Sequence, residues 1–354
     1  MRIGLYGLPT AGKTYILNEI NMLEVLSGST LLMELEPNFH SLGETGRKLA
    51  RERLANNLRA KDMFIMDGHY SFGDNVVFTE ADGELYDVFI YLYVKPEILE
   101  MRMEDSSRNS KYLEYDLNKW QNYEIDQLRK YCHEHDKDFY VIDNPEKGFL
   151  DDISIALEFI GAIVGGFSCR SFAEYIVGDI LRNSLDKEIV LFDGDKTLIK
   201  EDSSAITGYS THLFDGNFYT GFQTWRHHAE LQDYLRNTDY SCPDIYDIQL
   251  SFNHEILSQD NNGVILTTGY VGIWKQISER MGMTLYSGNQ MASETKYFVT
   301  KYLQNNNIRV KAYGDSMNDY FMLLQADEGY LISKGNGKVS RSLRNKQLEG
   351  IAIV

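Results

Sequence analysis

Two aspartates in the carboxy-terminal half are the residues best suited to chemistry on phosphate esters. The segment FDGDKTL at 192–198 follows the apolar run IVL at 189–191. On an extended segment, residues i and i+2 point to the same side, so Asp193 and Asp195 should face one site beyond the strand's carboxyl end. Two like charges there are costly unless a cation or an electrophile shares the site, as in phosphoryl transfer to a carboxylate nucleophile. Taken alone, the motif is more typical of an acidic turn that closes a strand.

Three further segments of the same half carry residues that could complete a phosphate site. One predicted strand ends in Thr267 and Thr268, a predicted helix carries Lys296, and another predicted strand ends in Asp315 and Asp319. Carboxylates are the hard oxygen ligands that Mg²⁺ prefers, while a hydroxyl and a lysine can hold a transferring phosphoryl group. Together with the first motif, these segments predict one magnesium-dependent phosphate site.

In order and approximate spacing, these four segments resemble the motifs of the haloacid dehalogenase-like (HAD) phosphatases, over about residues 170–354. The resemblance implies that Asp193 forms an aspartyl-phosphate and that Asp195 protonates the leaving oxygen and later activates water. It also implies that Lys296 and a hydroxyl hold the phosphoryl group; the following glycine favours Thr268, with Thr267 left open. The implied Mg²⁺ ligands are Asp193, Asp195 through its carbonyl, Asp315 and, indirectly, Asp319.

The segment between the first two motifs, about 199–262, is rich in aromatic residues. By position and helix-like pattern it resembles the helical cap of phosphoserine phosphatase-type members, which implies a lid over a small substrate. Arg226, His227 and His228 are expected on a solvated helix face, with substrate contact as the alternative. Lys196 departs from the family's usual fourth position in the first motif and adds a positive charge near the phosphate.

A second phosphate-directed motif opens the chain. The segment GLPTAGKT at 7–14 fits G-x-x-x-x-G-K-[ST] and stands between a predicted strand, 2–6, and a predicted helix. The glycines let backbone N–H groups turn toward the phosphates, Lys13 adds a positive charge, and the Thr14 hydroxyl can ligate Mg²⁺. Residues expected to hold ATP or GTP with its Mg²⁺ are Gly7, Thr10, Ala11, Gly12, Lys13 and Thr14.

The remaining candidates of this half follow later predicted strands. Asp67 comes after an apolar run and could hold Mg²⁺ through water or act as base toward an acceptor, although a turn residue fits equally well. With the run 88–94 and the helix after it, residues 1–165 resemble nucleoside-monophosphate kinases and related P-loop kinases of the adenylate kinase type. The resemblance implies that Arg102 and Arg108 clamp phosphates, solvated helix charges being the alternative.

These patterns predict an α/β protein of two doubly wound parallel-sheet domains, a P-loop NTPase fold and then a HAD-like Rossmannoid fold with the cap insert. The expected domains are 1–165 and 166–354, with the boundary at Gly165 and Gly166, although no linker rich in Pro, Gly or Ser follows. A chain of 354 residues is long enough for each to bury a core.

Composition narrows the partners. The net charge of −17 opposes a broad nucleic-acid or anionic-membrane surface, which needs clustered Lys and Arg. The cysteines, Cys132, Cys169 and Cys242, lack metal-ligand or redox spacing and fit a reducing compartment. No apolar run is long enough to span a membrane, and the amino terminus has no signal-peptide core, so we expect a cytoplasmic protein.

The sequence thus predicts a bifunctional enzyme, an ATP-using P-loop kinase joined to a capped Mg²⁺-dependent phosphatase of a small phosphomonoester. One alternative is a polynucleotide 5′-kinase/3′-phosphatase, which the acidity of the chain disfavours. Another is a phosphatase whose P-loop domain only senses nucleotide, since residues 34–59 carry no clear acceptor signature. Neither the phosphate acceptor nor the oligomeric state follows from the sequence.

Overall fold

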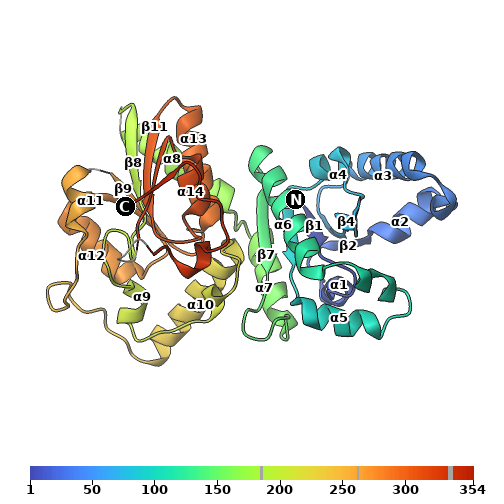
Figure 1. Cartoon of the computed structure of the whole chain (residues 1–354), viewed down its shortest axis with the longest axis horizontal. Coiled ribbons are helices and arrows are strands. Elements are labelled where there is room, and N and C mark those ends of the chain that lie inside the picture. The colour runs from blue at the N-terminus through green and yellow to red at the C-terminus, as the bar shows by residue number, and fades with distance from the viewer. Residues whose placement is uncertain (184–185, 261–262, 334–337) are drawn as a thin grey trace. The chain divides into compact units, whose positions relative to one another are not determined.

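The structure is a computed structural model that describes residues 1–183, 186–260, 263–333 and 338–354 (Figure 1). Its contacts divide the chain into two compact units, Met1–Phe167 and Ser168–Val354. Each unit is built on its own parallel sheet with helices around it, and neither sheet closes into a barrel. The predicted fold class, α/β with two parallel sheets, is therefore confirmed.

The amino-terminal unit has a five-stranded sheet in the order β2-β3-β1-β6-β7, with all neighbours parallel. Its strands are β1 (Arg2–Tyr6), β2 (Glu24–Ser27), β3 (Phe64–Asp67), β6 (Val88–Leu92) and β7 (Asp138–Ile142), beside a small hairpin of β4 (Ser71–Phe72) and β5 (Asn75–Val76). Its α-helices are α1 (Lys13–Glu19), α2 (Gly28–Leu35), α3 (Glu44–Leu58), α4 (Glu80–Leu85), α5 (Pro96–Glu104), α6 (Leu117–Glu134) and α7 (Ile153–Val164). Two short 3-10 helices are η1 (Phe39–Ser41) and η2 (Ser110–Glu114).

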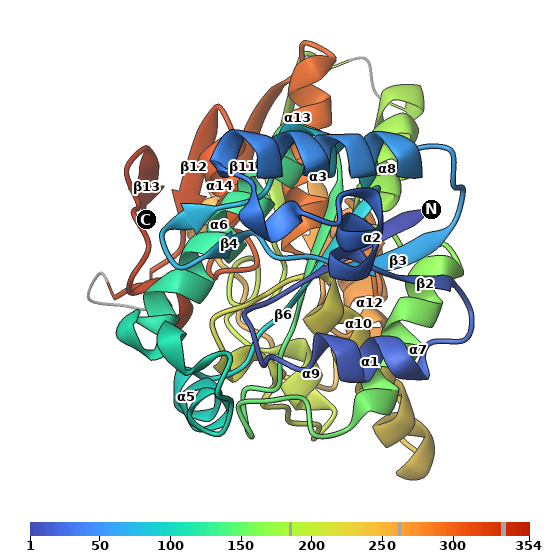
Figure 2. The ribbon, with the colours of Figure 1, turned by 90° about the vertical axis from the view of Figure 1, so that its right-hand side faces the viewer.

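The centre of this sheet explains where its motifs lie. All five residues of β6 are buried, as expected of a parallel strand covered on both faces. Helix α1 packs beside α7, and α2 beside α3 (Figure 2). Because parallel strands end at one edge, β1 delivers the phosphate-loop motif, and β3 delivers Asp67, to the same edge.

The carboxy-terminal unit has a six-stranded sheet in the order β10-β9-β8-β11-β12-β13, again with parallel neighbours. Its strands are β8 (Glu188–Phe192), β9 (Val264–Thr267), β10 (Thr284–Ser287), β11 (Arg309–Gly314), β12 (Glu328–Leu331) and β13 (Ile351–Ile353). The α-helices outside the segment between β8 and β9 are α8 (Cys169–Asn183), α12 (Val271–Met281), α13 (Ser293–Asn305) and α14 (Tyr320–Gln325), with the 3-10 helix η4 (Arg341–Leu343) near the carboxyl end.

Alternating side chains place β8 between two cores. Leu191 packs with α8 and α13 in one hydrophobic cluster, whereas Val190 and Phe192 pack with α12 in another. This is the period of two that a strand imposes when both of its faces are covered. The last three residues of β8 are buried, and the next residue, Asp193, emerges at the carboxyl end of this central strand.

The segment between β8 and β9, which is expected to form a cap insert, is only partly helical in its described residues; 261 and 262 lie outside them. Its longest element is α10 (Gly221–Asn237), which begins with a capping box formed by Thr220 and Gln223. The remaining helices are short: α9 (Ser203–Ile206), η3 (Leu213–Asp215) and α11 (His254–Gln259).

No single helix among the described residues is long and apolar enough to cross a membrane. The consecutive helices α7 and α8 reach that criterion only when they are counted together as one bent pair.

Candidate active sites

The first acidic motif stands where three strands of the second sheet end. β8 lies between β9 and β11, and the Asp193 N–H donates to the Tyr313 carbonyl at 2.9 Å, which extends the pairing by one residue. Gly194 has no room for a side chain, because a Cβ there would lie 2.6 Å from Thr267 Oγ1. The close approach of the β8 and β9 ends therefore requires glycine between the two aspartates.

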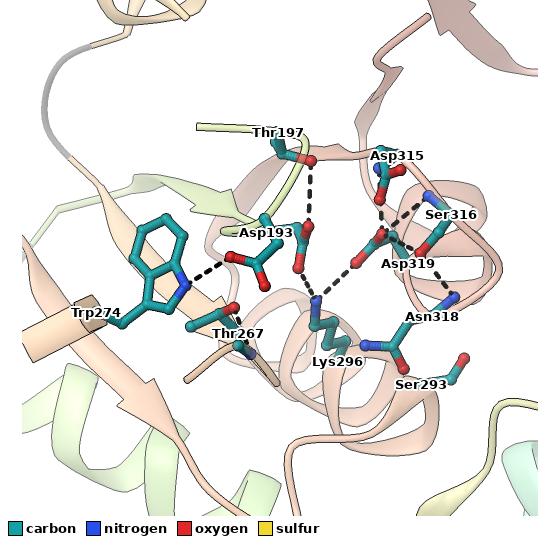
Figure 3. A network of polar contacts seen from close by, with 12 residues as sticks. Asp193, Thr197, Thr267, Trp274, Ser293, Lys296, Asp315, Ser316, Asn318 and Asp319 are labelled. Carbon is teal, nitrogen blue, oxygen red and sulfur yellow. Dashed lines mark hydrogen bonds and ion pairs between the residues drawn. The ribbon is translucent and has the colours of Figure 1, made fainter. Parts of the chain in front are cut away.

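Lys296 joins two of the carboxylates (Figure 3). Its Nζ donates to Asp193 Oδ1 at 2.6 Å and to Asp319 Oδ1 at 2.7 Å. Burial lowers the pKa of Lys296, but Asp193 and Asp319 outweigh it and raise the pKa above its ordinary value. Burial, together with the charge of Asp319, raises the pKa of Asp193 to about 6. A positive charge is thus held in a buried site beside two acids.

The second acidic pair turns toward the same point. Asp319 Oδ2 accepts hydrogen bonds from the backbone N–H groups of Asp315 and Ser316, at 3.2 and 3.1 Å. One carboxylate oxygen each from Asp193, Asp315 and Asp319 lies within 4.8 Å of the others, and all three residues are buried. Buried Asn318 Oδ1 has no hydrogen-bond partner within the described part of the chain. Clustered hard oxygens fit Mg²⁺, so the donor set agrees with the expected ion.

Asp195 occupies a different environment from Asp193. Its Oδ1 accepts from Trp274 Nε1 at 2.9 Å and its Oδ2 from Ser203 Oγ at 2.9 Å. Burial, then the charges of Asp202 and Asp193, raise the pKa of Asp195 to about 7. Its carboxylate lies outside the three-carboxylate cluster, which leaves the main-chain carbonyl as the group that could reach a metal. Two adjacent acids in such different surroundings can take different roles.

The two threonines after β9 differ in position. Thr267 ends the strand, is 1% exposed, and its Oγ1 accepts from the Gly269 N–H at 3.0 Å. Thr268 is half-buried and faces a cavity beside the cap. Thr267 Oγ1 thus lies beside the acidic motif, 2.6 Å from the position of a Cβ at Gly194, whereas Thr268 lines the cavity.

The residues of the cap insert are not all exposed to solvent as expected. His227 is only 7% exposed, so the expected solvated helix face is wrong for this residue. Arg226 is paired with Glu230 at 2.7 Å. Lys196 has a positive φ of 61°, and its Nζ lies 2.6 Å from Asp202 Oδ2. Burial lowers the pKa of Lys196, but Asp202 and, more weakly, Asp315 outweigh it and raise the pKa above its ordinary value.

The phosphate loop of the first unit has the backbone conformation that its motif requires. Gly7, Thr10 and Gly12 have φ values of 147°, 64° and 107°. Lys13 is buried, and its Nζ donates to the carbonyls of Gly7 and Leu8. Burial lowers the pKa of Lys13 to about 8, although Glu124 and Asp67 act in the opposite direction. Within the described part of the chain, the Lys13 ammonium is thus held by two carbonyls of the loop.

Of the other candidate residues of this unit, two make hydrogen bonds within the fold and two are exposed to solvent. Arg102 Nη1 donates to the carbonyls of Thr10 and Ala11, at 3.2 and 3.3 Å, so this arginine braces the phosphate loop. Asp67 Oδ1 accepts from the Gly28 N–H at 3.0 Å. Arg108 and Thr14 are exposed. The structure thus brings Asp67 and Arg102 to the loop and leaves Arg108 on the surface.

Sequence reasoning missed three residues of these sites. Ser203 follows Asp202, the N-cap of α9, and an aspartate before two serines was a capping signal that could have located it. Trp274 gave no signal beyond its place on an amphipathic helix. Glu124 is buried in α6, but this helix also carries several exposed charged residues, so the sequence does not distinguish Glu124 from them.

No family model and no curated protein matches this chain. The solved structures that match include shikimate kinases and a HAD family hydrolase. Shikimate kinase from Acinetobacter baumannii, in complex with shikimate, is 18% identical over 52% of this chain and 95% of that one, with a TM-score of 0.30. Shikimate kinase from Bacteroides thetaiotaomicron is 16% identical over 47% and 98%, with a TM-score of 0.34. A HAD family hydrolase from Salmonella enterica serovar Typhi is 16% identical over 52% and 76%, with a TM-score of 0.32.

These are the two kinds of protein that the motifs resemble, but such low scores add no weight to any residue's role. The order of the strands and the place of each motif at a strand end define two folds. The first unit has a P-loop kinase-like fold, and the second has a HAD hydrolase-like fold.

Proposed function

We propose that the carboxy-terminal unit is a Mg²⁺-dependent phosphatase that hydrolyses a small phosphomonoester through an aspartyl-phosphate. The observation that carries this proposal is the buried bridge of Lys296 to Asp193 and Asp319. Burial of an ion pair away from water costs stability. Such a buried pair is expected in a site that stabilises charge during a reaction. An ordinary acidic turn would have no need of a fully buried lysine.

The residues divide the reaction into two balanced steps. An Asp193 carboxylate oxygen attacks phosphorus as the bond to the ester oxygen breaks, and Asp195 gives its proton to that oxygen, releasing the alcohol. Asp195 then takes a proton from water as the water attacks phosphorus, which restores Asp193 and releases phosphate. A pKa of Asp195 raised to about 7 suits a group that must donate and then accept a proton near neutral pH.

The surrounding groups hold the phosphoryl oxygens. Lys296 supplies a fixed positive charge, and Thr267 supplies a hydroxyl at the end of β9. Asp193 and Asp315, with Asp319 behind them, would hold Mg²⁺, which supplies charge neutralisation and orients the phosphate when bound.

We further propose that the amino-terminal unit transfers a phosphoryl group from ATP or GTP. The support is the buried Lys13 inside a loop braced by Arg102, with Asp67 close enough to act on the charge of Lys13. A carboxylate beside a phosphate loop can orient Mg²⁺ or act as base toward an acceptor hydroxyl, and the second role is specific to a transferase. If both units acted on one group of one compound, the result would be futile nucleotide hydrolysis, so their substrates or positions must differ.

Separate inactivation tests both proposals. Asp193→Asn should abolish phosphate release from phosphomonoesters and leave labelled γ-phosphate transfer intact, whereas Lys13→Ala should do the reverse. Both variants would be assayed against nucleotides, sugars and short 5′-hydroxyl oligonucleotides. Loss of both activities in either single variant would contradict two independent sites. Phosphate release that changes with nucleotide, without any γ-phosphate transfer, would instead identify the first unit as a sensor.

A further inference from the structure

A small cavity lies between the cap helix α10 and the loop that follows β9. His227 and His228 line it from α10, and Thr268, Gly269 and Tyr270 line it from the loop. Its volume of about 10 Å³ is enough for roughly one water molecule. A larger molecule could occupy it only if α10 moved away from the loop.

The cavity adjoins the carboxyl group of Asp195. A Cβ at Gly269 would lie 2.7 Å from Asp195 Oδ2 and 2.5 Å from Ser203 Oγ, so only a glycine fits between the cavity and this carboxyl. The Tyr270 N–H donates to Ser203 Oγ at 2.8 Å, which ties the cavity wall to the same group. The cavity therefore lies one residue away from the carboxyl group that is proposed to protonate the ester oxygen.

His227 has unused hydrogen-bonding capacity in this wall. Its Nε2 lies 3.4 Å from Ser204 Oγ, and its Nδ1, although buried, has no partner among the described residues. Burial lowers the pKa of His227, so the ring is neutral at physiological pH. A buried ring nitrogen without a partner is costly unless a ligand or a water satisfies it.

The charges around the cavity do not suit a second anion. None of the described residues that line it is a lysine or an arginine. Of the nearby cations, Lys196 is paired with Asp202 at 2.6 Å and Arg226 with Glu230 at 2.7 Å. Arg226 Nη1 has no hydrogen-bond partner in the described ranges, but Glu230 balances the charge of this arginine. A carboxylate or phosphate placed here would lose its hydration beside Asp195 without gaining an unpaired cation.

We propose that this cavity is the leaving-group pocket of the phosphatase, that His227 binds a hydroxyl of the departing alcohol, and that the preferred substrates are phosphomonoesters of uncharged, hydroxyl-bearing alcohols. The proposal rests on the phosphatase function proposed above. It deepens that function by naming the substrate class, and it makes His227 a residue that determines specificity.

The test compares two esters that differ in one group. Glycerol 3-phosphate carries a hydroxymethyl group where 3-phosphoglycerate carries a carboxylate, so their kcat/KM ratio measures the pocket's preference. Exchange of ¹⁸O between inorganic phosphate and water, with Mg²⁺ present, reports the aspartyl-phosphate chemistry without any alcohol. The variants are His227→Leu, the hydrogen-bonding His227→Gln, and His254→Leu as a control on an exposed histidine of the same insert.

The wild-type protein should prefer glycerol 3-phosphate by at least about tenfold, since a desolvated charge costs more than 1.4 kcal/mol. His227→Leu should lower the ratio of glycerol 3-phosphate hydrolysis to oxygen exchange by about tenfold, the worth of one hydrogen bond, with partial recovery in His227→Gln. His254→Leu should match the wild type.

Oxygen exchange without this preference, or without hydrolysis of either ester, would overturn the pocket assignment alone. So would an unchanged hydrolysis-to-exchange ratio in His227→Leu. Absence of oxygen exchange in the wild-type protein would overturn the phosphatase function, and the pocket assignment with it.

Discussion

The indole Nε1 of Trp274 donates a 2.9 Å hydrogen bond to Oδ1 of Asp195. The same nitrogen lies 3.2 Å from Ser203 Oγ, and that hydroxyl donates to Oδ2. Two donors on the two oxygens hold the carboxyl plane in one orientation, and the ring that carries one of them is fully buried. Asp195 is therefore positioned by a helix residue and a cap residue, apart from the carboxylate cluster.

Trp274→Phe should reveal whether that orientation is used in catalysis. Loss of one donor should lower kcat by about tenfold for an alkyl ester such as glycerol 3-phosphate. The loss should be smaller for p-nitrophenyl phosphate, because nitrophenolate departs without needing a proton. Steady-state kinetics on both esters measure the difference. An equal loss on the two esters would show that the indole does not act through protonation of the leaving oxygen.

Lys296→Met should lower the free energy of unfolding, because it leaves two buried acids without their cation. Removing the lysine leaves Asp193 and Asp319 buried without their cation, and such a change typically costs about 3 to 5 kcal/mol of unfolding free energy. Because Mg²⁺ can replace part of the missing charge, its addition should stabilise this variant more than the wild type. Urea unfolding with and without Mg²⁺ measures both effects.

Lys275→Met is the matched control, because Lys275 is exposed on α12 of the same unit. It should unfold at the wild-type urea concentration. A metal-free Lys296→Met protein as stable as this control would contradict the ion-pair assignment.

Much of the fold and part of the site follow from local sequence. Strand β6 is a continuous apolar run and β8 is one from Ile189 onward, because parallel strands are covered on both faces, and such runs stand out in the sequence. A motif that follows a parallel strand must lie at the sheet's carboxyl edge, which places the phosphate loop after β1, Asp193 after β8 and Asp315 after β11 without any tertiary information.

The rest depends on packing that no local pattern encodes. Trp274 reaches Asp195 from 79 positions away. The period of α10 predicts a helix, but not that His227 would turn inward against the loop after β9. Thr267 and Thr268 differ only in whether the strand has ended, and element boundaries are what sequence predicts least well.

Glu124 should make the stability of the amino-terminal unit depend on pH. Its carboxylate accepts hydrogen bonds from Ser71, Trp120 and Tyr91, yet burial keeps its pKa above the ordinary 4.5. The folded protein thus binds this proton more tightly than the unfolded chain does. Stability should fall as the pH rises from 4.5 to the raised pKa and then level off.

Glu124→Gln isolates this contribution. The amide oxygen can accept from Ser71 and Trp120, and the amide nitrogen can donate to the Tyr91 hydroxyl, so the network survives without a titrating group. Denaturant unfolding across the pH range should show a smaller decline in the variant. Identical pH profiles would mean that Glu124 has the same pKa in both states.

Arg102→Met should weaken nucleotide binding without touching the phosphate contacts directly. The arginine braces the carbonyls of Thr10 and Ala11, and loss of these two bonds should raise the Kd for ATP by about tenfold. Titration calorimetry measures the change. Arg108→Met is the comparison, since that residue is exposed. A larger loss of affinity in Arg108→Met than in Arg102→Met would contradict the importance of the Arg102 contacts for nucleotide binding.

Thr267→Val should separate the two threonines that the sequence left open. Valine keeps the shape of a side chain that is 1% exposed but removes the hydroxyl beside the acidic motif. Inhibition by inorganic phosphate, which needs the phosphoryl contacts and no alcohol, should weaken about tenfold more in Thr267→Val than in Thr268→Val. Because Thr268 faces the leaving-group pocket, its variant should instead change the preference between esters. The reverse order of phosphate inhibition would restore Thr268 as the phosphate-binding hydroxyl.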